Sequence, residues 1–354
     1  MEEKYKKYKT KYLELKNNNI NNMIGGGQSS ESSHNLIGGK LNDVIYQGSK
    51  IIYNNGKITE KNYKSTTDTM YQIASCSKFI TSLVVAKLYE FGKLDYDIDI
   101  NKYLKKWKCP VDGITLKHLL THTSGSSDHN GFLGMDPQIP YKQDVKLNID
   151  IITGNSYSKP FDITEKLGKK FMYSGTGYQV IQQVLEEVTN KRLFQLMEQY
   201  IFKPLNLKNS TGKLLYEGKH KYKLADMDGL YRMYPETAAA GVWMSCNDLL
   251  NLALDLTDSY NNDNGKILQQ KTIQMITKGE HPEWKKQYAN YGLGMFVGDI
   301  EGKKLFAHNG ANYGYNMHFH CVPEKNQIEI LMVNYNPKYF KELNKQINNK
   351  LKIK

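Results

Sequence analysis

Long apolar runs, paired cysteines and a secretory leader are missing from this chain of 354 residues. No apolar run approaches the roughly 20 residues that a membrane-spanning helix needs, so we expect no membrane span. The N-terminus lacks the apolar core of a signal peptide, so we expect an intracellular, cytoplasmic protein with reduced thiols. The absence of a Cys-x-x-Cys pair argues against a disulfide scaffold or a zinc ribbon, and predicts small buried side chains at Cys76, Cys109, Cys246 and Cys321.

Motifs of several enzyme classes are also missing. The sequence has no G-x-S-x-G, which disfavours an α/β-hydrolase, and no Walker A or G-x-G-x-x-G motif for a nucleotide. His118 and His122 have the spacing of a zinc protease, but Leu119 stands where the general-base Glu is required. The two histidines of the stretch 314–322 share one strand face, whereas Cys321 points to the other. We therefore predict neither a metal nor another cofactor.

Positive charge is concentrated at the two ends of the chain. The formal net charge is +12, of which residues 1–20 carry +3 and residues 338–354 carry +5. Only +4 is left for residues 21–337. A basic tail can bind acidic surfaces. We favour a solubilising role for the two basic ends and do not expect nucleic acid as a partner.

The first 40 residues differ in composition from the rest. Tyr and Leu residues recur at helical spacing over 3–16, which predicts a short amphipathic helix. Asn-rich and Gly-rich tracts follow, and these cannot build a core. We therefore divide the chain into a flexible basic leader and linker, 1–40, and a globular domain, 41–354. Such a leader is similar to those of large DNA viruses with AT-rich genomes.

The globular part begins and ends with strand patterns. Residues 43–53 predict a pair of strands with a turn at Gly48. Ser245 and Asp248 form a capping-box signature at the start of a helix. Helices are predicted at 76–91, 115–121, 176–190, 246–256 and 338–352, and further strands at 293–299, 303–308, 314–322 and 327–334. This order predicts an α+β fold, in which helices flank an antiparallel sheet built from both termini and a helical region is inserted.

The sharpest local feature is an S-x-x-K motif formed by Ser75 and Lys78. At the start of the helix predicted over 76–91, these two side chains lie on one face, one turn apart. A serine there can attack a carbonyl group if the lysine is kept neutral by burial. The motif occurs in β-lactamases and penicillin-binding proteins, but any helix can also contain it by chance.

Two other segments carry groups suited to the same chemistry. Tyr173 precedes an amphipathic helix, and a phenol beside a lysine can relay protons. His308 and Gly310 lie at the end of a predicted strand, where Gly310 allows close approach to the backbone. The N–H of Ala311 is placed to pair with that of Ser75 as an oxyanion hole. Taken singly, a Tyr or a His is more often a packing residue.

Together these motifs resemble the serine β-lactamase-like family, which includes class C β-lactamases, D-alanyl-D-alanine carboxypeptidases, D-aminopeptidases and related esterases. The resemblance spans about 42–335 in order and spacing. Beyond the three motifs, it rests on GKLDYDIDINKYL at 92–104, ITLKHLLTHTSG at 114–125, FKPLNLKNST at 202–211, AAAGVWMSCNDLLNLA at 238–253, YGLGMF at 291–296 and HNGANYGY at 308–315.

The resemblance also implies residue roles and a β-lactamase/transpeptidase-like fold. Ser75 matches the acylated nucleophile, Lys78 its activator and Tyr173 the proton relay. His308 and Gly310 match the third motif, where other branches have Lys-Thr-Gly, and Ala311 matches the backbone oxyanion donor. The second motif is usually Tyr-x-Asn, but Gly175 stands at the Asn position. In the family that Asn contacts both the lysine and the substrate amide.

We therefore expect a serine hydrolase that acts through a covalent acyl-enzyme on a small-molecule ester, amide or peptide-like substrate. Gly175 favours ester over amide or β-lactam turnover. It also favours the alternative, a catalytically weakened relative with a binding or structural role. The sequence leaves the oligomeric state and the natural substrate open.

Overall fold

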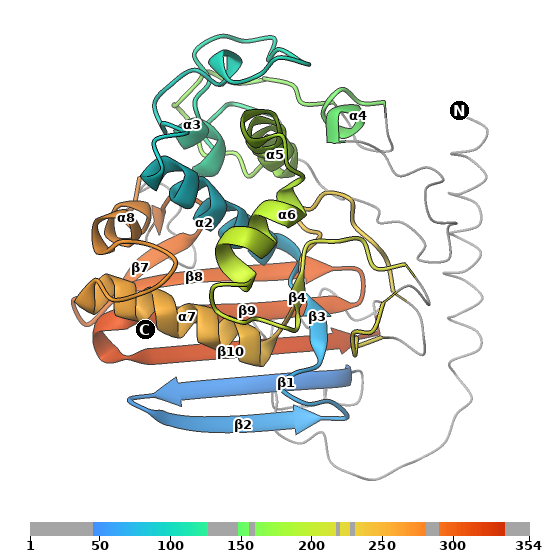
Figure 1. The fold of residues 1–354 in the computed structure, drawn as a ribbon, viewed down its shortest axis with the longest axis vertical. Helices are drawn as coiled ribbons and strands as arrows, with labels where there is room; N and C mark the ends of the chain where they lie inside the picture. Colours follow the sequence, from blue (N-terminus) through green and yellow to red (C-terminus); the bar gives the residue numbers. More distant parts are fainter. Residues whose placement is uncertain are drawn as a thin grey trace. The chain divides into compact units, whose positions relative to one another are not determined.

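The computed structural model describes residues 45–126, 148–155, 160–216, 220–226, 231–280 and 290–336. They form a large antiparallel sheet with helices packed on it, the α+β fold that the sequence predicts (Figure 1). The helices predicted at 3–16 and 338–352 and the boundary near residue 41 lie outside the described residues and stay predictions.

The large sheet brings the two ends of the described chain together. Its strand order is β2-β1-β10-β9-β8-β7-β6, and neighbouring strands are antiparallel. The pairing of β1 with β10 sets Ile51 opposite Ile330, two buried residues from opposite ends of the domain. The strands are β1 (Ile45–Asn54), β2 (Lys57–Tyr63), β6 (Asn290–Tyr291), β7 (Phe296–Ile300), β8 (Lys303–Asn312), β9 (Tyr315–Val322) and β10 (Gln327–Tyr335).

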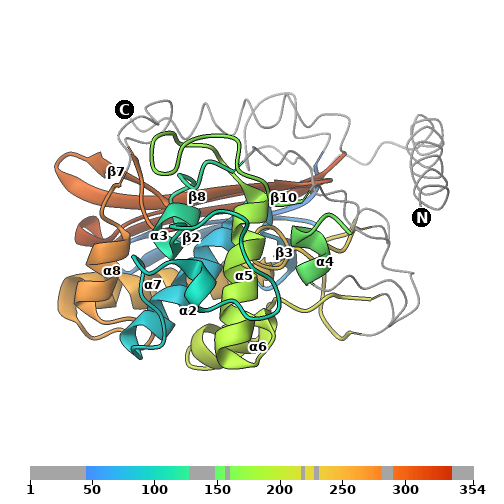
Figure 2. The ribbon, with the colours of Figure 1, turned by 90° about the horizontal axis from the view of Figure 1, so that it is seen from above.

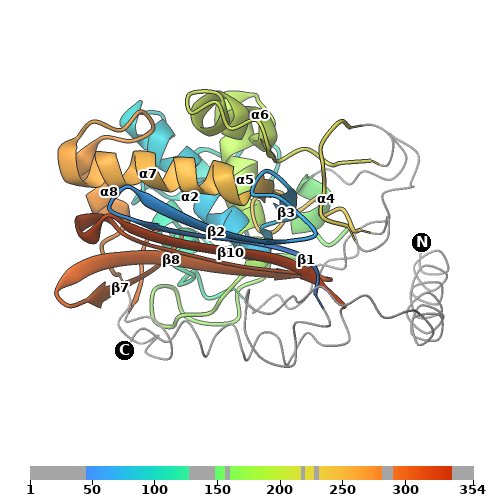
Figure 3. The same cartoon turned by 90° about the horizontal axis from the view of Figure 1, so that it is seen from below.

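Helices cover one face of this sheet, as the two views turned from Figure 1 show (Figures 2 and 3). They are α2 (Ser77–Glu90), α3 (Leu116–Leu120), α4 (Asn148–Ile152), α5 (Gly175–Thr189), α6 (Leu193–Met197), α7 (Cys246–Asn262) and α8 (Gln270–Ile276). A smaller sheet has the order β3 (Met70–Gln72), β5 (Trp243–Ser245) and β4 (Ser210–Thr211). None of the described helices is both long and apolar enough to cross a membrane.

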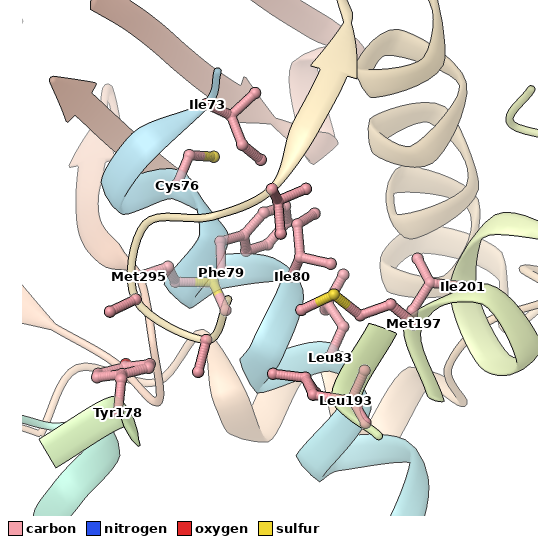
Figure 4. Packing of buried hydrophobic residues seen from close by; sticks show 14 of the residues in the cluster. Ile73, Cys76, Phe79, Ile80, Leu83, Tyr178, Leu193, Met197, Ile201 and Met295 are labelled. Atoms are coloured by element: carbon pink, nitrogen blue, oxygen red, sulfur yellow. The ribbon is translucent and has the colours of Figure 1, made fainter. Parts of the chain in front are cut away.

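Helix α2 is the centre of the core, because it is buried at 11 of its 14 residues. Phe79, Ile80 and Leu83 pack between the sheet and helix α6 (Figure 4). Such all-round burial follows from a sequence that is apolar over most of the helix, and not along one stripe only. The helix ends at Glu90, and Gly92 takes the left-handed conformation (φ +64°) expected of a glycine after a helix.

Some boundaries differ from the sequence-based expectation. Residues 45–54 form the single strand β1, and Gly48 lies within it, paired with Tyr63 and Val333. The prediction of a turn at Gly48 was wrong because a glycine can also sit inside a strand that has partners on both sides. Strand β8 runs on to Asn312, past the predicted end at 308.

The capping prediction for α7 is half right. The Ser245 hydroxyl accepts the Asp248 N–H as expected. The Asp248 carboxylate instead accepts hydrogen bonds from Asn209 and Ser210, so it fixes β4 against the helix. All four cysteines are buried and free, as predicted.

Candidate active site

Ser75 lies in a tight turn between β3 and α2. Residues Ala74–Cys76 form one 3₁₀ turn, and Ala74 has a left-handed backbone (φ +47°) that is uncommon for a residue with a side chain. The turn leaves Ser75 partly exposed and sends Cys76 into the core, where burial raises the pKa of its thiol (Figure 4). Cys76 is therefore a buried packing residue, and Ser75 is the residue of this turn that solvent reaches.

Lys78 occupies the first turn of α2 and is almost entirely buried, with 2% of its surface exposed. Its Nζ lies 3.3 Å from the Ser75 Oγ and donates a hydrogen bond of 2.9 Å to the Ala239 carbonyl. Within the described residues the structure records no ion pair for this lysine. Burial without a counter-charge disfavours the ammonium form and lowers the pKa of Lys78 to about 7.

The segment 238–242 is hydrogen-bonded to the start of α2 and supplies the Ala239 carbonyl that accepts from Lys78. Thr81 Oγ1 donates to the Ala238 carbonyl (3.0 Å), and the Val242 N–H donates to the Ser77 hydroxyl (3.0 Å). Hydroxyl residues on one side of α2 thus position the acceptor for Lys78. No sequence signal identified the Ala239 carbonyl, because every residue carries one.

Tyr173 comes just before helix α5, as predicted. Ser174 caps this helix, since its hydroxyl accepts the Gly177 N–H. The Lys78 Nζ lies 4.8 Å from the centre of the Tyr173 ring, within the range of a cation–π contact. Gly175 is the first residue of α5, is buried and does not have a positive φ.

Strand β8 runs beside the Ser75 turn. A Cβ added at Gly310 would lie 2.1 Å from the Ile73 carbonyl oxygen, so only glycine permits this approach. The close approach predicted at Gly310 is thus made by the protein's own backbone. Ala311, the next residue, is exposed.

The strand register shows where the Ala311 N–H points. Ile300 and Lys303 close a two-residue turn between β7 and β8, and hydrogen-bonded pairs alternate from there along an antiparallel ladder. Every second residue from Lys303 to Ala311 therefore turns its N–H toward the β7 side. Because β7 pairs with β8 only as far as Ala307, the Ala311 N–H lies beyond that pairing, on the open side of β8.

His308 belongs to strand β8 and is buried, with 1% of its surface exposed. Its Nδ1 donates to the Asn309 carbonyl (2.7 Å), so Nε2 is the acceptor for the Tyr291 hydroxyl at 3.3 Å. Burial, and then the charge of Lys78, lowers the pKa of His308 to about 3. The structure thus brings His308 into the same buried group as Lys78.

His122 is a member of this group that sequence reasoning considered only as a metal ligand. Its ring lies 4.2 Å from the Tyr173 ring, 5.2 Å from that of Tyr178 and 5.0 Å from that of Tyr291, centre to centre. His118 instead belongs to the cap of α3, where its Nδ1 contacts Thr115. The four-residue spacing was a signal, but it pointed to metal and not to aromatic packing.

The histidines of β9 form a separate pair. His318 and His320 share one strand face, as predicted, with the His318 Nε2 3.1 Å from the His320 Nδ1. Cys321 points to the other face and contacts Thr257 on α7. Across the described ranges, no three His, Cys, Asp or Glu side chains gather in a way that would hold a metal ion.

Known proteins are similar to this chain in sequence. The chain is 24% identical over 329 residues to the "Putative D-alanyl-D-alanine carboxypeptidase" of Escherichia coli K12, covering 78% of this chain and 73% of that protein. It is 30% identical over 193 residues to the teichoic acid D-alanine hydrolase of Staphylococcus aureus MRSA252, covering 52% of this chain and 45% of that protein.

A similar fold is found in the D-amino acid amidase of Ochrobactrum anthropi SV3 complexed with L-phenylalanine. The TM-score is 0.67 at 17% sequence identity, over 87% of this chain and 93% of that one. The family model described as Beta-lactamase matches residues 44–352, which include all the motifs described above. The protein therefore belongs to the beta-lactamase family.

Proposed function

We propose that the protein is a serine hydrolase that acts through an acyl-enzyme on Ser75. The observation that carries this proposal is the buried Lys78, whose Nζ lies 3.3 Å from the Ser75 Oγ and whose pKa is lowered to about 7. A lysine that is half neutral at physiological pH can accept a proton, whereas an ordinary lysine cannot.

The reaction starts when neutral Lys78 takes the hydroxyl proton of Ser75 and the Oγ attacks the substrate carbonyl carbon. The N–H groups of Ser75 and Ala311 stabilise the resulting oxyanion. The bond to the leaving group then breaks, and the leaving group receives its proton from Lys78 by way of Tyr173. In the second half, water attacks the acyl carbon and gives up a proton by way of Tyr173 and Lys78. The bond between the acyl carbon and the Ser75 Oγ then breaks, that proton passes to the Oγ, and the acid and free Ser75 are released.

The relatives indicate a substrate class. Their names refer to D-alanyl-D-alanine, to D-alanine on teichoic acid and to D-amino acid amides. We propose small D-aminoacyl compounds as substrates, with esters turned over faster than amides. Gly175 lacks the carboxamide that would bind a substrate amide, and an activated ester needs less help because its leaving group departs without a proton.

A non-catalytic relative that only binds such ligands is the second candidate, and Gly175 is the feature that favours it. In that case Lys78 would keep its lowered pKa, but Ser75 would accept no acyl group. The two candidates differ in one measurable property, namely covalent modification of Ser75.

Intact-mass spectrometry after exposure to a fluorophosphonate tests this directly. We expect one adduct on the wild type, none on Ser75→Ala, and labelling at least about 100-fold slower on Lys78→Met, the scale of a lost general base. D-alanyl and L-alanyl phenyl esters, compared on the same proteins, test the substrate class. Equal labelling of wild type and Ser75→Ala would exclude Ser75 as the nucleophile, and no labelling of any variant would support the non-catalytic candidate.

A further inference from the structure

His122 is buried beside the candidate site, yet none of the proposed steps uses it. It follows helix α3 with a left-handed backbone (φ +59°), and 1% of its surface is exposed. Asn, Asp and His are the residues with side chains most often found in this conformation. An imidazole enclosed by aromatic rings needs an explanation, because burying a polar ring costs free energy unless it makes specific contacts.

Three contacts join His122 to the short segment that carries Tyr173. The His122 carbonyl accepts the Met172 N–H at 2.7 Å, and the His122 Nδ1 accepts the Ser174 N–H at 3.0 Å. Between these two anchors, the imidazole packs on the Tyr173 ring with 4.2 Å between centres and 34° between planes. His122 therefore holds the backbone on both sides of Tyr173 as well as its ring.

The hydrogen bonds also fix the protonation state of His122. A backbone N–H can only donate, so Nδ1 must carry a lone pair and the proton of the neutral ring must lie on Nε2. Burial, and then the charges of Lys78 and His308, hold the pKa of His122 well below its usual range. Nε2 has no hydrogen-bond partner among the described residues, so the ring is held by Nδ1 and by its faces.

We propose that His122 is the positioning residue of Tyr173, which it holds beside Lys78 by its ring face and its Nδ1. The inference rests on the proposed function, in which Tyr173 relays protons. It assigns to His122 a role that acts through Tyr173, since both hydrogen bonds described above lead to the two neighbours of Tyr173 and the shortest ring contact of His122 is with Tyr173 itself.

Two variants separate the ring from the acceptor. His122→Asn keeps an acceptor at the position of Nδ1 and tolerates the left-handed backbone, but it removes the ring. His122→Phe keeps a ring and removes the acceptor. His118→Asn is the matched control, because it makes the same exchange four residues earlier, where Nδ1 accepts the Thr115 N–H at the cap of α3.

A double-mutant cycle with Tyr173→Phe is the main test. With Tyr173 present, we expect His122→Asn to lower kcat for a phenyl ester about 10-fold to 100-fold, as for a catalytic group displaced by about an ångström. In the Tyr173→Phe background, the same change should alter kcat by less than about twofold. His118→Asn should have no effect in either background. Equal losses in both backgrounds would overturn the proposal, because His122 would then act independently of Tyr173.

A spectroscopic measurement tests the placement without relying on turnover. With 3-fluorotyrosine at position 173, we expect a narrow ¹⁹F resonance well away from that of free fluorotyrosine. In His122→Asn the signal should broaden and move toward the free value, and in His118→Asn it should stay unchanged. An unchanged signal in His122→Asn would refute the positioning role even if the protein is an active hydrolase. A shifted signal in a protein that never labels at Ser75 would support the positioning role while rejecting the proposed activity.

Discussion

The lowered pKa of Lys78 makes a quantitative prediction about the pH dependence of Ser75 acylation. With a pKa of about 7, the lysine is neutral in roughly one molecule in eleven at pH 6, one in two at pH 7 and ten in eleven at pH 8. The neutral form is the base, so acylation should become faster as the pH rises. We expect a rise of about 10-fold from pH 6 to pH 8 and a plateau above that.

An ordinary lysine would behave differently. With its pKa at 10.5, only about one molecule in three thousand is neutral at pH 7, and the rate would rise about 100-fold from pH 6 to pH 8 with no plateau. His122 and His308 do not compete with this interpretation, because burial holds the pKa of each histidine below its usual range. The position of the plateau therefore reports on Lys78.

The assay is the second-order rate constant for fluorophosphonate labelling between pH 5.5 and pH 9.5 at constant ionic strength. Lys78→Met should remove the inflection and leave a slow rate that rises with hydroxide concentration. A profile in the wild type that is flat from pH 6 to pH 8, or one that still climbs tenfold per pH unit at pH 9, would refute the assignment of Lys78 as the base.

Three other outcomes can be measured on the same protein. The folded chain releases the Lys78 proton more readily than the unfolded chain, so the free energy of unfolding should rise between pH 7 and pH 10.5. In Lys78→Met, chemical denaturation should show this rise reduced by up to about 5 kcal/mol. Gly310→Ala should displace the turn at Ile73, slow labelling at least about tenfold and lower the free energy of unfolding by about 1–3 kcal/mol. Gly302→Ala is its control, because the added Cβ would lie in open space, and it should cost about 1–2 kcal/mol of stability without slowing labelling. Deletion of residues 1–40 should leave the melting temperature and the labelling rate within error of the wild type, and a fall of more than about 5 °C would show that the leader stabilises the domain.

The sequence predicted the helices and strands that carry the site better than the contacts within the site. Period-two and helical patterns depend on local residue order, so the strands β7 to β10 and the helices α2, α5 and α7 were expected close to where they lie. The S-x-x-K spacing put Ser75 and Lys78 side by side, and the family resemblance added Tyr173, whose ring the structure places 4.8 Å from the Lys78 Nζ. The turn expected at Gly48 failed because a lone glycine does not distinguish a turn from a strand with two partners.

Contacts between distant segments could not be predicted in the same way. The Ala239 carbonyl and the His122 ring reach the site across more than 40 residues of sequence, and neither residue type is specific for the contact that it makes. Gly310 was identified correctly as a point of close approach, but its neighbour there, the Ile73 carbonyl, was not predicted. Which atom fills the space beside a glycine depends on packing, and a single sequence does not contain that information.

The site holds three basic side chains in one buried group, and the order in which they bind protons decides how it behaves. Lys78 has the highest pKa of the three, at about 7, and its positive charge is one of the causes that lower the pKa of His122 and of His308. When the pH falls, Lys78 therefore takes up the first proton, and its charge adds to burial in keeping both histidines neutral. One proton removes the base, while the neutral His122 continues to accept the Ser174 N–H beside Tyr173. Loss of acylation near pH 6 should thus be a change of charge at Lys78 alone, with the aromatic packing around Tyr173 intact.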